Sequence, residues 1–229
     1  MIPGLGADDR LFEYQVNHFN NITVLPLLKA EKHETPEEYA IRISCNLVKS
    51  ESTVVCGVSF GGVLAPYIAK HIDAKVCILV SSLQYPCQFP WYYRLFKPFV
   101  MCSLFTRMIL WLSKIVLLVV WPILRVLLPK DLLSICVQYI TSSTAKMASL
   151  LRLLYVWVYT PEDKRFSRDC IAYVIHGAND KIIPIHFVSP HFTVGGGHFL
   201  PLTHPTIIND TISAITARVQ TDSSAPESP

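Results

Sequence analysis

Apolar residues fall in short continuous runs, and segments with helical spacing separate these runs. The predicted strands are 22–28 (ITVLPLL), 53–58 (TVVCGV), 75–80 (KVCILV), 170–175 (CIAYVI) and the short 192–194 (FTV). The predicted helices are 35–48, 62–72 and 204–219. Strands that are apolar throughout and alternate with helices are typical of a parallel sheet with both faces covered. The sequence therefore predicts the α/β class, with ligands bound at the carboxyl ends of the strands.

The helix predicted at 35–48 has a clear start signal. Thr35 is a good N-cap, Pro36 suits the first helical position, and Glu37 and Glu38 suit the positive end of the helix dipole.

Residues 84–160 interrupt the alternation of strands and helices. They contain helical runs at 99–112, 115–128 and 132–158 that prolines punctuate. We expect a helical cap inserted over the sheet edge. The chain then divides into a first part of the core, the cap, a second part of the core and a polar, disordered tail, at 1–83, 84–160, 161–221 and 222–229.

The predicted cap is strongly basic and apolar. It has eight Lys and Arg side chains against Asp131 alone, and it holds all four tryptophans. Its longest uncharged apolar piece, 115–124, has ten residues, whereas a spanning helix needs about 20. We therefore favour a helical insertion over the sheet edge, for which contact with a membrane surface stays open, over a transmembrane helix. A cap that packs on the core and keeps its basic side chains in solvent would explain the same charge.

Composition and charge exclude several classes of function. The net charge is +3, without the basic stripe that nucleic-acid binding requires, so no nucleic-acid partner is expected. Seven cysteines without a C-x-x-C pair indicate buried free thiols in a reducing compartment. We expect a cytoplasmic protein, associated with membrane only through the cap. The sequence shows no cofactor-binding fingerprint and no metal-ligand spacing, so neither a cofactor nor a metal is expected.

Glycine is scarce, and its positions point to the chemistry. The nine glycines fall in four short clusters, where the backbone has the greatest need for them. In the cluster GVSFGG, Ser59 follows a predicted strand and precedes a predicted helix, and Gly57 and Gly61 flank it. This pattern is typical of a nucleophile elbow. A purely structural strand-to-helix turn is the alternative.

Two further clusters supply an acid and a base. Asp180 lies in HGANDKIIP after the strand 170–175, and His198 ends the glycine run of GGGHFL. An aspartate in a polar loop is most often a turn residue. Asp180 is therefore a candidate for the acid only because of the other motifs around it. His204 fits a helix start before Pro205, and we expect His176 to point away from the acid loop. The order Ser59, Asp180, His198 is that of a strand-turn-helix hydrolase.

The first cluster, PGLGADD, suits an oxyanion hole. The backbone N–H groups of Leu5 and Phe60 are the candidate donors, one from this loop and one from the residue after Ser59. An ordinary glycine turn is the alternative.

The motifs IPGLGADDRLF, GVSFGG, HGANDKIIP and GGGHFL resemble those of serine hydrolases of the α/β-hydrolase superfamily, especially small esterase- and thioesterase-like members. The resemblance implies that Ser59 is the nucleophile, His198 the base and Asp180 the orienting acid. It also implies a strand before the oxyanion loop, of which this sequence holds Met1 and Ile2, so we expect a short sheet there. Pro3 stands where many relatives have histidine.

The leading hypothesis is a hydrolase that cleaves a carboxylic ester or thioester through an acyl-enzyme. We expect the cap to hold an apolar acyl group. The alternative is a catalytically weak or inactive hydrolase-fold protein that binds lipid, a membrane surface or a partner. Haloperoxidase or lyase chemistry on the same scaffold also stays open.

Overall fold

The centre of the molecule is a four-stranded parallel sheet in the order β1-β2-β3-β4. The computed structural model describes residues 1–160 and 170–223, with side chains up to residue 217. The strands are β1 (Val54–Val58), β2 (Val76–Val80), β3 (Ile171–Gly177) and β4 (Phe192–Val194). Val54 pairs with Val76, and Val76 with Ile171, so the first three strands start level. The predicted parallel sheet is confirmed.

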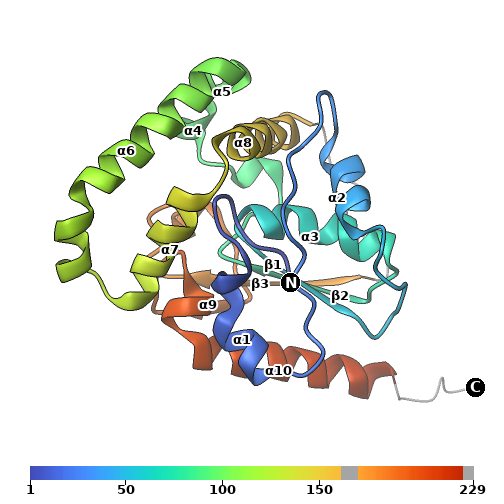
Figure 1. The fold of residues 1–229 in the computed structure, drawn as a ribbon. Coiled ribbons are helices and arrows are strands. Elements are labelled where there is room, and N and C mark those ends of the chain that lie inside the picture. The colour runs from blue at the N-terminus through green and yellow to red at the C-terminus, as the bar shows by residue number, and fades with distance from the viewer. Residues whose placement is uncertain (161–169, 224–229) are drawn as a thin grey trace, which may run out of the picture.

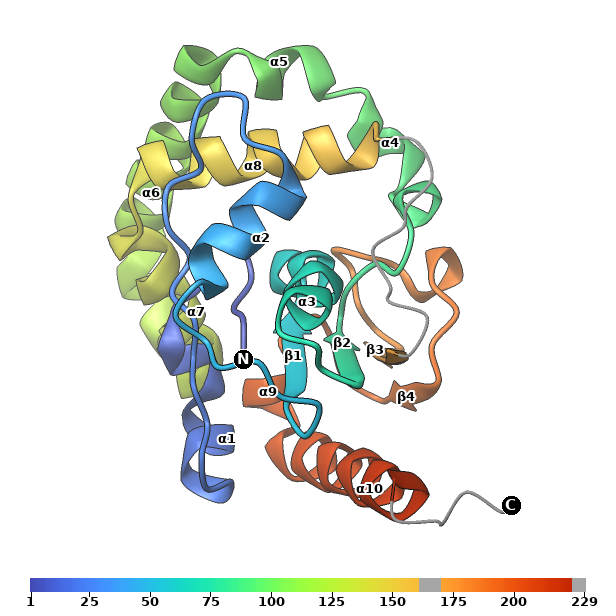
Figure 2. The same cartoon turned by 90° about the vertical axis from the view of Figure 1, so that its right-hand side faces the viewer.

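Helices cover both faces of this sheet (Figures 1 and 2). On one face lie α2 (Pro36–Ser44) and α3 (Phe60–His71). On the other lie η1 (Asp9–Phe12), α1 (Glu13–His18), α9 (Leu200–Thr203) and α10 (Pro205–Ser223). Of the predicted tail 222–229, residues 222 and 223 belong to α10, and 224–229 lie outside the described residues.

The strands divide their side chains between two cores. Val55, Leu79 and Val174 pack on the α3 side, whereas Val58 and Ile78 pack on the α10 side. Successive side chains of a strand point to opposite faces, so strands that are apolar throughout bury both sides. This burial accounts for the unbroken apolar runs in the sequence.

The N-terminus supplies a short extra pairing beside β1. Ile2 forms a parallel bridge with Gly57, in which its N–H donates to Cys56 O at 2.9 Å and its carbonyl accepts from Val58 N–H at 3.0 Å. The predicted strand 22–28 is wrong, since no strand is assigned there. Among the described residues, the backbone of Met1 bonds this segment, at Thr23 and Leu25. A single paired residue is too short a partner to hold a strand of seven.

The segment 84–160 is helical and lies over the sheet (Figure 2). It contains η2 (Pro86–Gln88), α4 (Trp91–Arg94), α5 (Lys97–Met101), α6 (Ser103–Leu127), α7 (Lys130–Thr141) and α8 (Thr144–Val158). The two runs predicted at 99–112 and 115–128 meet in α6, because Ser113 and Lys114 continue the helix instead of breaking it. The run predicted at 132–158 is broken at Ser142, where α7 ends and Ser143 caps α8.

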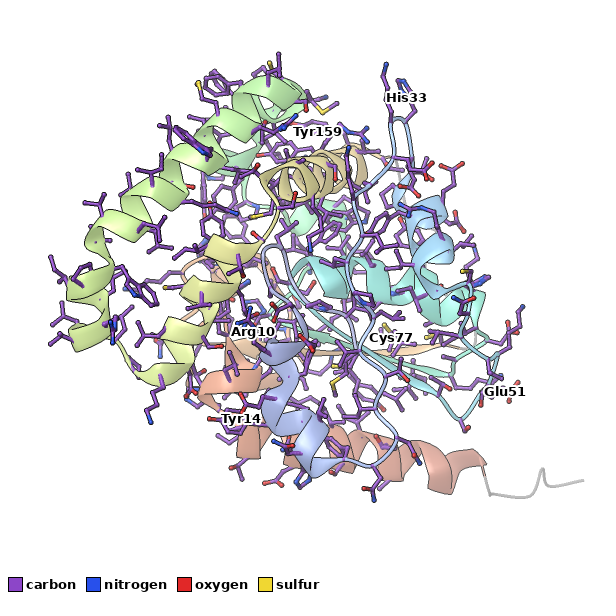
Figure 3. All side chains as sticks on the ribbon, viewed as in Figure 1. Arg10, Tyr14, His33, Glu51, Cys77 and Tyr159 are labelled. Atoms are coloured by element: carbon purple, nitrogen blue, oxygen red, sulfur yellow. The ribbon has the colours of Figure 1, made fainter. Side chains whose placement is uncertain are left out.

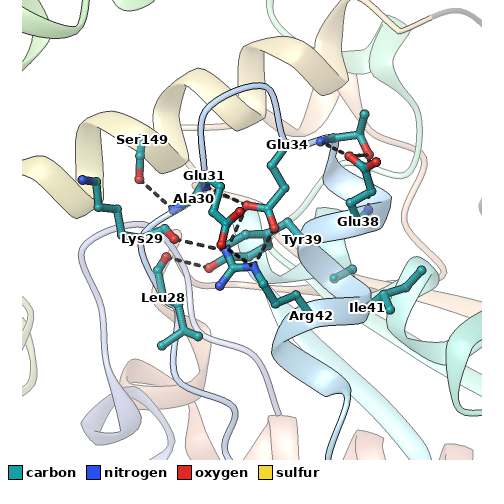
Figure 4. A network of polar contacts seen from close by, with 12 residues as sticks. Leu28, Lys29, Ala30, Glu31, Glu34, Glu38, Tyr39, Ile41, Arg42 and Ser149 are labelled. Carbon is teal, nitrogen blue, oxygen red and sulfur yellow. Dashed lines mark hydrogen bonds and ion pairs between the residues drawn. The ribbon is translucent and has the colours of Figure 1, made fainter.

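Polar contacts tie the loop before α2 to the cap (Figure 4). The N–H of Ala30 donates to Ser149 Oγ of α8 at 2.9 Å. From α2, the guanidinium of Arg42 binds Glu34 of this loop at 2.7 Å. The predicted helix start is confirmed: Thr35 Oγ1 accepts from the N–H of Glu38, whose carboxylate accepts from Thr35 N–H. Of these contacts, the bond between Ala30 and Ser149 joins this loop to α8.

None of the seven cysteines, all of which lie in the described part of the chain, forms a disulfide, and their predicted burial is wrong for three of them. Cys45, Cys87 and Cys102 are exposed, whereas Cys56 and Cys77 lie in the buried strands. Figure 3 shows the side chains on the ribbon, with Cys77 inside the sheet layer.

Candidate active site

Ser59 stands on a sharp turn between β1 and α3. Its backbone angles are φ 53° and ψ −119°, a conformation that a residue with a side chain adopts only at a cost of about 1–3 kcal/mol. Its N–H donates to Val80 O at 3.0 Å, and its carbonyl accepts from Ser82 Oγ at 2.6 Å. These two bonds to the end of β2 hold the strained residue in place.

Two glycines make this turn sterically possible. A Cβ at Gly57 would lie 2.2 Å from the carbonyl oxygen of Gly61, and a Cβ at Gly61 would lie 2.2 Å from that of Ile2. The elbow is therefore packed directly against the backbone of the loop that follows Ile2.

Asp180 and His198 come together although 18 residues separate them. His198 Nδ1 lies 2.7 Å from Asp180 Oδ2. A carboxylate only accepts hydrogen bonds, so the proton sits on Nδ1 and Nε2 keeps a free lone pair. Asp180 Oδ1 also accepts from the N–H groups of Ile182 and Ile183, at 2.8 and 2.9 Å. Hydrogen bonds to both of its oxygens therefore fix the Asp180 carboxylate.

These partners keep Asp180 ionised. Its side chain is fully buried, and burial alone would raise the pKa of the carboxyl. The hydrogen bond and charge interaction with His198, together with the amides of Ile183 and Ile182, outweigh burial and hold the pKa of Asp180 below its usual value. A buried carboxylate of this kind orients the imidazole and stabilises its protonated form.

His176 lies behind this pair, and the expectation that it points away from the acid loop is wrong. Its Nε2 donates to the carbonyl of Ile183 at 2.8 Å and lies 3.5 Å from Asp180 Oδ2. The side chain is completely buried, and this burial lowers the pKa of His176. It points inward because β3 continues to Gly177, so that His176 is still a strand residue.

The predicted oxyanion donors lie beside the serine. A Cβ built at Gly4 would lie 3.1 Å from Ser59 Cβ, which places the loop of Leu5 against the elbow. Neither Leu5 N–H nor Phe60 N–H has an acceptor among the described residues. Phe60 is the first residue of α3, where an N–H has no partner within the helix. Both groups are therefore free to bind an oxygen.

A cavity of about 300 Å³ opens at Ser59. Leu5, Ser59 and Phe60 line it together, with Ser82 from the end of β2. Most of its other walls are apolar side chains of α8, the acid loop and the start of the cap: Leu151, Leu154, Ile182, Ile183, Phe89 and Pro90. This volume is at the lower end of the ~300–1,000 Å³ of small-molecule sites.

The three predicted catalytic residues thus lie at one edge of the sheet. Ser59, Asp180 and His198 follow β1, β3 and β4 respectively. Among the described residues, Ser59 Oγ has no hydrogen-bond partner. Bonds between nucleophile and base are often long in a site without substrate. No group of three or more potential metal ligands occurs in the part of the chain that the structure describes.

Sequence reasoning missed two residues that shape the site. Ser82 binds the carbonyl of Ser59, and its side chain would collide with a Cβ at Gly62. His176 supports the acid loop. The signal for Ser82 was its place just after the strand 75–80, at the edge where ligands bind. The signal for His176 was its place at the end of the strand 170–175.

The comparisons with known proteins agree with this architecture at the level of the fold. No family model matches the chain, and no curated protein sequence matches it. Solved structures do match. An esterase from Thermogutta terrifontis has a TM-score of 0.64 at 17% identity, over 95% of this chain and 88% of that one.

Two further solved structures match in the same way. MenH from S. aureus has a TM-score of 0.67 at 18% identity, over 96% of this chain and 92% of its own. An epoxide hydrolase from Bacillus megaterium has a TM-score of 0.64 at 14% identity, over 93% of this chain and 90% of its own. The chain therefore has the α/β-hydrolase fold, with its parallel sheet flanked by helices.

Proposed function

We propose that this chain, which has the α/β-hydrolase fold, is a serine hydrolase that cleaves a carboxylic ester or thioester through an acyl-enzyme. The observation that carries the proposal is the buried His198–Asp180 pair, at 2.7 Å, on the same sheet edge as the strained Ser59. An esterase and an epoxide hydrolase among the structural neighbours support a hydrolase.

Acylation begins at Ser59. His198 Nε2 takes the proton of Ser59 Oγ while the oxygen attacks the substrate carbonyl carbon, and Asp180 stabilises the imidazolium that forms. The carbonyl oxygen becomes negative and accepts from Leu5 N–H and Phe60 N–H. Collapse of the intermediate breaks the bond to the alcohol or thiol, which leaves with the proton from His198.

Deacylation repeats these steps with water. His198 takes a proton from the water, whose oxygen attacks the acyl carbon on Ser59. The same two N–H groups hold the second oxyanion, and Ser59 Oγ recovers its proton from His198 as the acid is released. Two N–H donors suffice, because each donor in such a site contributes about 3–4 kcal/mol to the transition state.

The cavity supports an apolar acyl group. Its walls are mostly aliphatic and aromatic, and Ser59 and Ser82 contribute hydroxyl groups to the lining. An acyl chain in this cavity would contact Leu151 and Leu154 of α8, while the carbonyl lies against Phe60. The cap thus forms the binding wall for the acyl group.

Pre-steady-state hydrolysis of p-nitrophenyl esters tests the proposal. We expect a burst of p-nitrophenol equal to the enzyme concentration, followed by slower turnover, because the acyl-enzyme accumulates. Ser59→Ala removes the burst. Ser52→Ala is the matched control, since Ser52 lies on an exposed turn and its hydroxyl bonds that of Ser50, and it should keep the burst. A folded wild-type protein that shows neither burst nor turnover with esters or thioesters would favour the non-catalytic binding protein instead.

A further inference from the structure

The outward face of α6 is apolar over its whole length. Leu104 is 78% exposed and Val126 is 84% exposed. Between them, large apolar side chains recur every three or four residues: Met108, Trp111, Ile115, Val119 and Ile123. In Figure 1 this helix lies on the outside of the molecule. By length and composition it is the one described helix that could cross a membrane, and 6% of its most apolar window is buried.

The inward face of the same helix contains a buried lysine. Thr106, Leu110 and Lys114 are buried at intervals of four residues. Lys114 Nζ donates to the carbonyl of Ile140 at 3.2 Å and to that of Ser142 at the end of α7. Ser113 also bonds Tyr139 across the two helices. These contacts fix the rotation of α6, so its apolar stripe faces outward although a lysine is turned inward.

Basic side chains follow one flank of the stripe. Arg107 and Arg125 are exposed and 18 residues apart. At about 3.6 residues per turn this is five turns, so both lie on one line along the helix. Lys130 is exposed just beyond the end of α6, and Asp131 is the single acid in 84–160. The surface is therefore apolar with a positive border.

We propose that this outward face of α6 docks on the surface of an anionic lipid bilayer, with the helix lying in the membrane plane. An apolar stripe with a basic flank is the pattern that binds such surfaces. Trp111, which is 57% exposed, is a side chain that prefers the interface of headgroups and acyl chains. The inference stands apart from the proposed hydrolysis, because none of these residues lines the cavity.

Charge and packing favour a lipid surface on this face over a second copy of the chain and over a membrane-spanning α6. A second copy of the chain seated on this face would bring Arg107 and Arg125 of both copies to one interface, where the segment 84–160 of each copy offers Asp131 as its single acid. A spanning helix would require α6 to leave α7, which would break the bonds of Lys114 and Ser113.

Vesicle co-sedimentation tests the docking surface. We compare vesicles of phosphatidylcholine with vesicles that also contain phosphatidylglycerol. We expect at least about tenfold stronger binding to the anionic vesicles at low salt, and loss of most of that advantage near 0.5 M NaCl, where charges are screened within a few ångströms. Tryptophan fluorescence should shift to the blue on binding as Trp111 leaves water.

Matched variants locate the surface. Val126→Glu should weaken binding about tenfold, since a buried valine is worth about that factor. Val48→Glu makes the same change at a residue that is 83% exposed but remote from α6, and it should bind like wild type. Arg107→Gln combined with Arg125→Gln should weaken low-salt binding about 25-fold, at about fivefold for each charge. Ser59→Ala should bind unchanged, which separates docking from catalysis.

Several outcomes would overturn the proposal. These are a folded wild type that binds neither kind of vesicle, equal binding to both kinds, or equal effects of Val126→Glu and Val48→Glu. Protein that resists extraction from vesicles by alkaline carbonate would show a spanning helix instead. A dimer in size-exclusion chromatography that Val126→Glu dissociates, without vesicle binding, would assign this face to a second copy.

Discussion

Gly61→Ala adds one methyl group where the elbow touches the loop that follows Ile2. The new Cβ would lie 2.2 Å from Ile2 O and 2.6 Å from Pro3 O. Carbon and oxygen normally approach no closer than about 3.3 Å, so the two backbones must separate by about 1 Å. Backbone atoms cannot rotate away as a flexible side chain can, so the loop or the elbow has to move.

The expected loss of stability follows from two opposing effects. Gly61 lies in the first turn of α3, and alanine favours a helix over glycine by up to about 1 kcal/mol. Overpacking costs about 1–3 kcal/mol, and the backbone obstruction places this case at the upper end. We expect a net loss of about 1–2 kcal/mol, which corresponds to a Tm lower by about 2–8 °C for a chain of this size.

Gly61→Ala should also reduce ester turnover, and this loss should be large. The loop that moves carries Leu5, and a shift of about 1 Å at an oxyanion donor reduces turnover by about 100-fold. Thermal denaturation and ester hydrolysis measure the two effects on the same sample.

Two other glycines provide graded controls. A Cβ at Gly195 meets no atom within 4 Å, so Gly195→Ala should keep wild-type activity, with a Tm unchanged or slightly higher. Gly4→Ala meets Ser59 Cβ at 3.1 Å and should fall between the two. Wild-type Tm and turnover in Gly61→Ala would refute the packing of loop against elbow. If Gly195→Ala lost as much Tm and turnover as Gly61→Ala, steric contact of the new methyl group would not be the cause of the effect.

Four further predictions follow from single contacts. Asp180→Asn should lower ester turnover by about 10²–10⁴-fold without unfolding the protein, and a loss below tenfold would contradict its role beside His198. Thr35→Ala removes the cap of α2 and should lower the free energy of unfolding in urea by about 1 kcal/mol, whereas Thr35→Ser should keep most of it. Burial lowers the pKa of His176, so the unfolded chain binds this proton first, and stability should fall as the pH drops below about 6.5. His176→Gln should remove that part of the slope, and an unchanged slope would count against the buried neutral imidazole. Leu154→Trp should fill the cavity and reduce kcat/KM for longer acyl esters more than for acetate, with equal losses arguing for another acyl site.

The sequence was most informative where one local rule decided the structure. Runs of β-branched residues predicted the strands around Val54–Val58 and Val76–Val80, because burial on both faces leaves no polar positions. Thr35 with Pro36 predicted the start of α2, since an N-cap and a first-turn proline depend on adjacent residues only. The turn at Ser59 followed from its glycines in the same way.

Tertiary contacts decided the rest. The apolar run 22–28 forms no strand because Met1 offers it only one residue to pair with, which the run itself does not reveal. Lys114 seemed to interrupt the helical run, yet carbonyl groups at the end of α7 accept its hydrogen bonds and let α6 continue. His176 points toward Asp180 because β3 runs on to Gly177.

The most direct measurement is peptide mapping of the protein after reaction with a fluorophosphonate, which bonds covalently to an activated serine oxygen. The account predicts one adduct per chain on Ser59 Oγ, absent in Ser59→Ala and formed far more slowly in His198→Ala, where no base takes the proton. An unlabelled Ser59 in folded protein, or an adduct on a different serine, would contradict it.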